Sequence, residues 1–303
     1  MGRRRKGRDV SGWVVVDKPA GIGSTDVVNK VRWAFEARKA GHAGTLDPDA
    51  TGLLAIALGE ATKVIPHLTD ALKAYDFDMA FGSATTTDDA SGEVIATSDV
   101  RPDDAALRVT LAQFTGDIEQ VPPQVSAVKV EGERAYALAR EGVEMELAPR
   151  PLHVAELSLL DRPDADRATL RMVCGRGGYV RALARDLGEA LGTRAHVTSL
   201  RRTWSGPFTL KNAATLPDIE ELARTPAIDT LLRPIEDGLA HVPRALIAGL
   251  SVQRLSNGNP VEVLSTDANF GDTVWVEHDG MALAIGTYRA GMVHPDRVLN
   301  RAP

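Results

Sequence analysis

The sequence has one cysteine, few aromatic residues and no long apolar run. Cys174 has no second cysteine to pair with in the 303-residue chain, which fits a reducing compartment. No apolar stretch approaches the roughly 20 residues that cross a bilayer. The apolar run at 13–16, behind a basic start, is too short for a signal-peptide core. We therefore expect a cytoplasmic protein that does not enter a membrane.

Basic residues are fewer than acidic ones, with 35 Lys and Arg against 41 Asp and Glu and a formal net charge of -6. Five of the basic residues lie within the first eight positions. The acidic excess argues weakly against a nucleic-acid partner, but a basic arm or a basic groove on an acidic body still binds RNA. A solvated, disordered end explains residues 1–9 equally well, so both interpretations stay open.

Apolar periodicity predicts alternating strands and helices in the first two thirds of the chain. Tyr75, Phe77, Met79 and Phe81 alternate with polar or small residues, as in a strand with one apolar face. The other predicted elements are strands at 12–17, 53–58 and 170–174, a helix from a Ser24 or Thr25 cap to Phe35, and helices at 60–68 and 180–191. Residues 41–52 are rich in Gly, Asp and Pro, which predicts irregular structure, and 122–151 is predicted to leave the core as an excursion.

The C-terminal part has a different composition. Residues 217–243 hold four prolines, which predicts helix fragments and a linker. A short helix is expected at 251–255, and a hairpin at 274–285 turns at Asp279-Gly280. We expect a small β-rich second domain from about residue 241 to 303.

Asp47 lies in the segment Gly-His-Ala-Gly-Thr-Leu-Asp-Pro-Asp-Ala-Thr-Gly-Leu-Leu, residues 41–54. Gly44 and Pro48 constrain the chain on either side of it. A carboxylate on a constrained loop can be a nucleophile, a general base or a metal ligand. Only Asp49 lies near enough in sequence to share a metal, so we expect no metal site. By spacing alone, Asp47 is best explained as a turn former.

This segment resembles the signature of the bacterial tRNA pseudouridine-55 synthases, the TruB family. The resemblance extends through residues 12–208 in the family's order. Its further motifs are Val-Val-Val-Asp-Lys-Pro-Ala-Gly at 14–21, Gly-Glu-Ala-Thr-Lys at 59–63, Lys-Ala-Tyr at 73–75, Pro-Pro at 122–123 with Ser-Ala-Val-Lys at 126–129, Cys-Gly-Arg-Gly-Gly-Tyr-Val-Arg at 174–181, and His-Val-Thr-Ser-Leu-Arg-Arg at 196–202.

The resemblance implies roles for individual residues. Asp47 matches the catalytic aspartate, Tyr75 the tyrosine that stacks on the target base, and Arg181 the arginine that pairs with the carboxylate. The remaining matches are His42, which enters the RNA loop in place of the flipped base, Tyr179 and Leu200, which line the uracil pocket, and Lys18, which lies near the site or supports it. Without the resemblance, Tyr75, Tyr179 and Leu200 would be read as packing residues, His42 as structural or exposed, and Arg181 as a solvated charge.

The family implies a mixed α/β (α+β) fold with a mainly antiparallel catalytic sheet over residues 10–240, an RNA-binding insertion at about 122–151, and a PUA-like domain at 241–303. It also implies isomerisation of uridine 55 in the tRNA T loop without a cofactor. We expect a monomer, and nothing in the sequence implies a protein partner. Candidate phosphate contacts are the basic arm, Lys129, Arg134, Arg140, Arg176, Arg201 and Arg202.

Two departures and two alternatives stand beside this prediction. Thr86 occupies the position where the family usually has Asp, and the Gly-rich turn has Arg176 and Gly178 where many members have Lys and Thr. The alternatives are a synthase for another RNA and a non-catalytic RNA-binding protein on the same scaffold. The combination of Asp47, Tyr75 and Arg181 argues against the second, because binding alone does not require a nucleophile.

Overall fold

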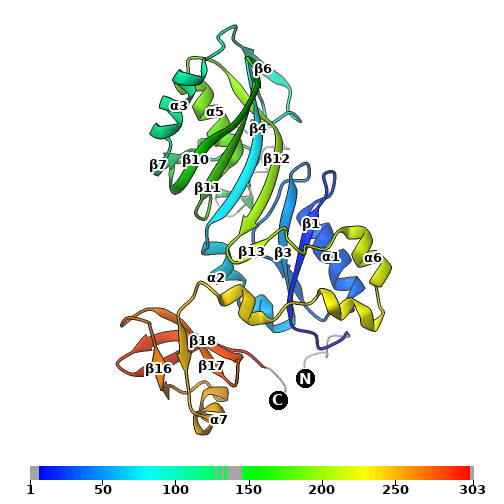
Figure 1. The fold of residues 1–303 in the computed structure, drawn as a ribbon, viewed down its shortest axis with the longest axis vertical. Helices are drawn as coiled ribbons and strands as arrows, with labels where there is room; N and C mark the ends of the chain where they lie inside the picture. Colours follow the sequence, from blue (N-terminus) through cyan, green and yellow to red (C-terminus); the bar gives the residue numbers. More distant parts are fainter. Residues whose placement is uncertain (1–6, 127, 131–132, 135–144, 301–303) are drawn as a thin grey trace. The chain divides into compact units, whose positions relative to one another are not determined.

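The computed structural model describes residues 7–126, 128–130, 133–134 and 145–300. The chain forms two compact units (Figure 1). The first comprises Met1–Pro48, Gly52–Ala71 and Trp204–Pro303, and the second comprises Asp49–Thr51 and Leu72–Thr203. No helix in the described ranges is long and apolar enough to cross a bilayer. Most of the predicted basic arm (1–6) and Arg140 lie outside the described residues.

The first unit is built on β1 (Gly12–Lys18), which pairs antiparallel with β3 (Thr51–Leu58). β2 (Ala40–His42) also pairs with β3. Both faces of β1 are covered by other elements, which is why the apolar residues at 13–16 follow one another without alternation. Val14 and Val16 pack with α1 (Ser24–Ala34) and α6 (Leu216–Leu222) on one face.

The opposite face of β1 packs against segments from far along the chain. Trp13 is fully buried, its ring centroid is 5.5 Å from that of Phe208, and its indole N–H donates to the carbonyl of Ile235 at 3.1 Å. The same core includes Leu68 of α2 (Ile65–Asp70) and Ile285 of the C-terminal sheet. Burial of apolar surface on both faces therefore fixes β1 and β3 as a rigid base.

The C-terminal part of the first unit is a six-stranded sheet in the order β15-β19-β18-β17-β14-β16. Its main strands are β14 (Arg244–Leu246), β17 (Thr273–His278), β18 (Met281–Arg289) and β19 (Met292–Val298). These strands have an apolar core of their own, to which α7 (Val252–Ser256) contributes Leu255. The predicted hairpin is confirmed: β17 and β18 pair around Asp279 and Gly280, both at positive φ as a tight hairpin turn requires.

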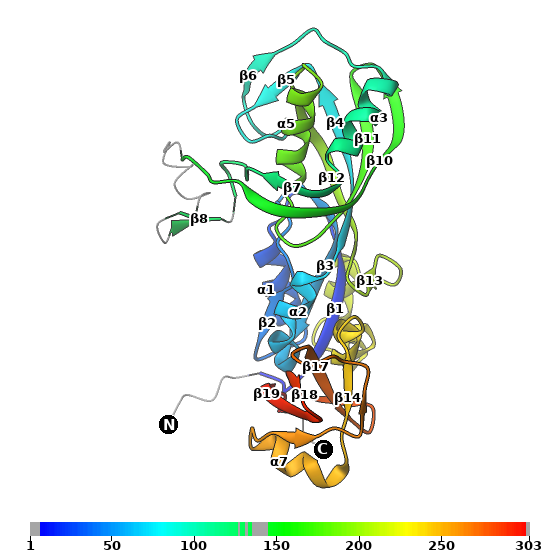
Figure 2. The ribbon, with the colours of Figure 1, turned by 90° about the vertical axis from the view of Figure 1, so that its left-hand side faces the viewer.

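The second unit is an antiparallel sheet with the strand order β12-β4-β11-β10-β7. Its strands are β4 (Lys73–Phe81), β7 (Gly116–Gln120), β10 (Arg150–Asp164), β11 (Arg167–Cys174) and β12 (Ala195–Ser205), whose last two residues belong to the first unit. The predicted alternation in β4 is confirmed, because Tyr75, Phe77 and Met79 are buried while Asp76 and Asp78 are partly exposed. Figure 2 shows α3 (Asp104–Gln113) and α5 (Val180–Ala190) against this sheet.

Two small hairpins extend from the second unit. β5 (Ser83–Thr85) pairs with β6 (Val94–Thr97), and β8 (Lys129–Val130) pairs with β9 (Glu133–Arg134). The second hairpin lies within the predicted insertion. The remaining short elements are η1 (Gly59–Lys63), β13 (Phe208–Thr209), η2 (Pro226–Leu231), η3 (Ile235–Leu239), η4 (Gly249–Ser251), β15 (Val261–Glu262) and β16 (Ser265–Thr266).

Three local predictions were wrong in detail. Gly23 is the N-cap of α1 and no side chain caps this helix. The predicted single helix at 60–68 is a 3-10 turn followed by α2, because Pro66 has no N–H to continue a helix and starts a new one. Residues 40–42 and 51–52 pair within the sheet, so only 43–50 of the Gly- and Asp-rich segment form the irregular loop.

Candidate active site

The Asp47 loop (residues 43–50) connects β2 to β3, and its residues up to Pro48, including Asp47, belong to the first unit. Gly44, within the loop, has φ 102°, and Gly52, at the start of β3, has φ 97°; both are backbone conformations that favour glycine. The Ala43 amide donates to the carbonyl of Ala55 at 3.0 Å and continues the strand pairing into the loop. Asp47 is half-buried near the end of the loop.

Ser24, at the start of α1, holds the residue before Asp47. Its hydroxyl donates to the carbonyl of Leu46 at 2.8 Å and accepts the amide of Leu46 at 2.8 Å. Ser24 and Leu46 are both buried. The hydroxyl that the sequence suggested as a helix cap is therefore used to fix the peptide next to Asp47.

Lys18, the last residue of β1, holds the residue after Asp47. Its ammonium is fully buried and donates to the carbonyls of Pro19, Ile22 and Pro48 at 2.9, 2.8 and 2.8 Å. The Gly21 amide also donates to the carbonyl of Pro48, at 3.0 Å. Because Lys18 has no exposed surface for a substrate, we assign it to the support of the loop, the second of the two roles expected for it.

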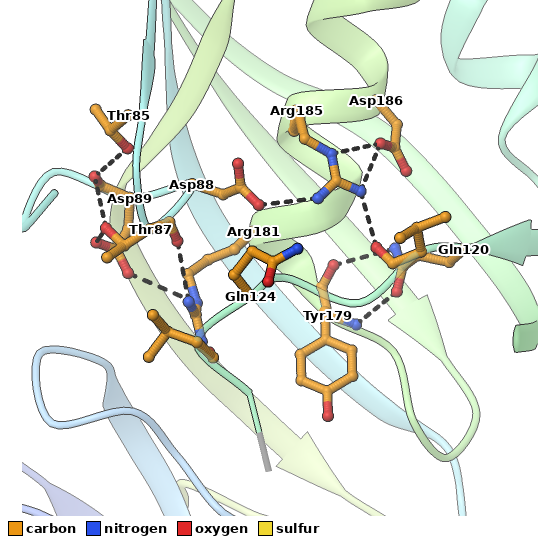
Figure 3. Close-up of polar contacts among 12 residues, drawn as sticks. Thr85, Thr87, Asp88, Asp89, Gln120, Gln124, Tyr179, Arg181, Arg185 and Asp186 are labelled. Carbon is orange, nitrogen blue, oxygen red and sulfur yellow. Dashed lines mark hydrogen bonds and ion pairs between the residues drawn. The ribbon is translucent and has the colours of Figure 1, made fainter. Parts of the chain in front are cut away.

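Arg181, in the first turn of α5, is held within the second unit by main-chain and acidic partners (Figure 3). Its Nη1 donates to the carbonyl of Thr87 at 3.0 Å, its Nη2 donates to the carbonyl of Val125 at 2.9 Å, and its Nε lies 3.6 Å from Asp89 Oδ2. Only 6% of the residue is exposed, so the solvated-charge alternative is wrong. These partners offset the unfavourable placement of a cation at a helix N-terminus.

The acidic turn (residues 85–92) joins β5 to β6. Asp89 Oδ1 accepts from the hydroxyls of Thr87 and Ser91, both at 2.6 Å, and from the Ser91 amide at 3.0 Å, which leaves Oδ2 beside Arg181. Thr86, where the resemblance leads one to expect Asp, instead pairs with the main chain of Glu93. Sequence reasoning missed Asp89; the available signal was two consecutive acids following three threonines.

Tyr179 precedes α5 as its N-cap residue and is held by Gln120. The Gln120 amide group accepts from the Tyr179 N–H at 2.9 Å and donates to the Tyr179 carbonyl at 3.1 Å. Figure 3 shows the Tyr179 ring directed away from this pair. Tyr179 packs against Met145 and Leu147, which lie within the predicted insertion, and remains partly exposed.

The other predicted site residues occupy distinct environments. Tyr75 is 9% exposed on β4, and His42 is half-buried at the end of β2. Leu200 on β12 is half-buried, and its carbonyl accepts from the Thr51 hydroxyl at 3.4 Å. The predicted Asp47–Arg181 pair joins residues of different units and stays a prediction.

The predicted phosphate contacts differ in exposure. Arg201 is partly exposed on β12, while Arg202 is 1% exposed. Arg202 is therefore unsuited to contact a phosphate at the surface, which corrects that expectation. The main chains of Lys129 and Arg134 face each other in the β8–β9 pair. The described residues contain no group of three or more His, Cys, Asp or Glu side chains placed to hold a metal ion.

Cys174 is unsuited to be a nucleophile. It is almost fully buried at the end of β11, and burial raises the pKa of its thiol to about 12. At neutral pH it remains protonated, and a thiol is a poor nucleophile.

Known proteins resemble this chain over nearly its full length. The family model described as TruB family pseudouridylate synthase (N terminal domain) matches residues 32–180, and the one described as tRNA pseudouridylate synthase B C-terminal domain matches 181–240. A tRNA pseudouridine synthase B from Roseobacter denitrificans is 62% identical over 300 residues, covering 99% of each chain. Another, from Dinoroseobacter shibae, is 61% identical and covers 98% of each chain.

Among solved structures, a chain in the crystal structure of a Cbf5-Nop10-Gar1 complex superimposes with a TM-score of 0.75. It is 27% identical, and the match covers 95% of this chain and 85% of that one. The fold is thus mixed α/β with mainly antiparallel sheets, as the sequence predicted.

Proposed function

The chain belongs to the TruB family of pseudouridylate synthases, and from this premise we propose that it isomerises uridine 55 in the T loop of tRNA, with Asp47 as the nucleophile. The reaction breaks the N1–C1′ glycosidic bond, turns the uracil, and forms a C5–C1′ bond. The hydrogen on C5 leaves as a proton and N1 gains one. Nothing is oxidised, so the reaction needs no redox cofactor.

One observation carries the assignment of Asp47. The main chain on both sides of this residue is fixed by buried side chains, with Ser24 on Leu46 and Lys18 on Pro48. A nucleophile aimed by a rigid support loses little freedom when the substrate binds, and such positioning supplies a large part of a catalytic rate. The same carboxylate suits attack at uracil C6 or at ribose C1′.

The other residues have roles around the extruded base. Tyr75 offers an aromatic face on which the uracil stacks, while Tyr179 and Leu200 complete the apolar pocket. His42 fills the place that the base leaves in the RNA loop. Arg181 pairs with the Asp47 carboxylate when the site is assembled and orients it toward the base.

The substrate is the T arm, bound by a cytoplasmic monomer. Lys129, Arg134 and Arg201 contact its phosphates, so binding weakens as salt concentration rises. Arg181 is reserved for the reacting centre and contributes little to this salt dependence.

The proposal is tested by release of tritium from [5-³H]uridine in a tRNA transcript. Wild-type protein releases tritium from the transcript and from an isolated T-arm hairpin, while Asp47→Asn releases none at any enzyme concentration. Its affinity for tRNA, measured by filter binding, stays within about twofold, because the carboxylate acts on the transition state and binding energy is largely separate. Asp49→Asn, an exposed carboxylate two residues away, is the matched control and keeps wild-type activity.

Two results would contradict the proposal. Turnover by Asp47→Asn would show that Asp47 is not the nucleophile. Release from an rRNA fragment without release from the T-arm hairpin would assign the enzyme to another RNA.

A further inference from the structure

Helix α5 carries a second arginine, Arg185, one turn beyond Arg181 and on the same helix face. Its Nη1 donates to Asp88 Oδ2 at 3.0 Å and its Nη2 donates to the carbonyl of Val121 at 2.8 Å. Its Nε donates to the neighbouring Asp186 at 2.9 Å. All three donor positions of the guanidinium therefore have partners (Figure 3).

The two arginines bridge the same two chain segments. One is the acidic turn; the other is the neck segment (residues 120–125), which leads from the end of β7 toward the predicted insertion. Arg181 joins Thr87 to Val125 across these segments, and Arg185 joins Asp88 to Val121. The neck segment is also tied to the start of α5 by the Gln120–Tyr179 pair. The turn, the neck segment and the helix are thus held together at successive points.

The Arg185 contacts are partly shielded from water. The side chains of Arg185 and Asp88 are 24% and 14% exposed. Burial raises the pKa of Asp88, and the Arg185 cation, with a smaller effect from Arg181, opposes that rise. Asp88 also has φ 59°, a conformation that non-glycine residues seldom adopt without support. A partly buried carboxylate in this conformation depends on the cations around it, and Arg185 is the one that donates a hydrogen bond to it.

A neighbouring arginine shows what an ordinary structural pair looks like in this unit. Arg194 contacts Glu189 at 3.3 Å near the other end of α5, with side chains 44% and 58% exposed. Exposed pairs of this kind contribute little, because water screens them. Arg185 differs because it is shielded and because it connects segments distant in sequence.

We propose that Arg185 is a positioning residue for Arg181. It sets the spacing between the acidic turn and the neck segment, and thereby places the two carbonyls that orient the Arg181 guanidinium. Arg185 itself contacts neither RNA nor the reacting atoms. This inference rests on the proposed function, in which Arg181 acts at the reacting centre.

Single-turnover rates with saturating tRNA test the role, because they report the chemical step apart from binding. Arg185→Gln lowers the rate constant on the order of 10- to 100-fold, the range expected when a catalytic group moves by about 1 Å. The dissociation constant for tRNA stays within about threefold. Arg185→Lys gives an intermediate rate, since an ammonium replaces the charge but lacks the planar fork that reaches two segments. Arg194→Gln is the matched control and reacts at the wild-type rate.

A double mutant separates this role from simple loss of stability. Asp88→Asn and Arg185→Gln remove the two ends of one contact, so their effects on the single-turnover rate are less than additive. Arg194→Gln combined with Asp88→Asn shows only the Asp88→Asn effect. Should Arg185→Gln fail to fold, the reduced rate of Arg185→Lys and its partial non-additivity with Asp88→Asn decide the question.

The positioning role is overturned if folded Arg185→Gln or Arg185→Lys reacts at the wild-type rate, or if its loss lies wholly in tRNA affinity. Wild-type protein and Asp47→Asn are assayed beside these variants. An inactive wild type would overturn the proposed function and this role with it. Active wild type with unaffected Arg185 variants overturns the positioning role alone.

Discussion

Asp47, in the first unit, is positioned through contacts to the main chain of its loop. Arg181, in the second unit, is positioned through contacts to its own side chain. Ser24 and Lys18 contact the peptides of Leu46 and Pro48, on either side of Asp47. The Arg181 guanidinium instead donates directly to two carbonyls and lies beside Asp89. Both supports are buried, but they fix different parts of the residue that they serve.

The difference follows from the length of the two side chains. An aspartate is short, so fixing its backbone fixes its carboxylate within a small volume. An arginine has four rotatable bonds before a planar group, so a fixed backbone leaves the guanidinium free, and only contacts at its far end orient it. Asp47 is therefore positioned by one hydroxyl and one ammonium that bind the main chain of its loop. Arg181 is positioned by two carbonyls and a carboxylate that contact its guanidinium.

Lys18→Met tests the strongest support in the loop and has the largest expected effect. It leaves three part-buried carbonyls without their charged donor and lowers the free energy of unfolding by about 3 kcal/mol. Urea unfolding followed by tryptophan fluorescence measures the change, since all four tryptophans belong to the first unit. Lys30→Met, which breaks an exposed pair with Glu220, is the control and costs less than about 1 kcal/mol. Equal losses in both variants would show that burial of Lys18 adds nothing.

Ser24→Ala tests whether main-chain support aims Asp47. It removes both hydrogen bonds to Leu46 while the helix keeps its Gly23 cap, so the loop loosens and α1 remains. We expect the single-turnover rate to fall roughly 10-fold, a smaller misplacement than loss of a charged support causes. Ser256→Ala, at an exposed hydroxyl on α7, is the control. A wild-type rate for folded Ser24→Ala would mean that Lys18 and the glycines fix the loop by themselves.

The smallest effect is expected at two adjacent residues of β12 that differ in exposure, Arg201 and Arg202. The effect is a change in tRNA affinity or in stability. Arg201→Gln weakens tRNA binding a few-fold and lowers the slope of log K against log salt by about 1, because one phosphate contact is lost. Arg202→Gln lowers stability and leaves the slope unchanged, because its side chain is buried. Binding titrations at several salt concentrations measure both slopes. A reduced slope in Arg202→Gln would restore the original expectation for this residue.

Sequence patterns predicted much of the fold because apolar periodicity is a local signal. The period-2 pattern of β4 and the stripe of α5 were read directly from neighbouring residues. The hairpin at Asp279-Gly280 was predicted because two positive φ angles in succession strongly limit the residues allowed there. The same local reasoning failed for Ser24, whose hydroxyl has a partner 22 residues away.

Candidate site residues divide along the same line. Asp47, Tyr75 and Arg181 were predicted from the family resemblance, which rests on motifs that each lie within a short segment of the chain. Asp89 and Arg185 were missed, because an acid in a polar turn and an arginine on an amphipathic helix are ordinary at those positions. Nothing local marks them as partners of the residues that they hold.

The sequence by itself determined strands β1, β3, β4 and β11, helices α1 and α5, the family and the loop that carries Asp47, because each depends on residues close together in the chain. Only the tertiary structure decided that Lys18 and Arg202 are buried and that Arg181 donates to Thr87, 94 residues away, and to Val125, 56 residues away. Those bonds end on carbonyls, which every residue has, so no side-chain pattern in the sequence records them.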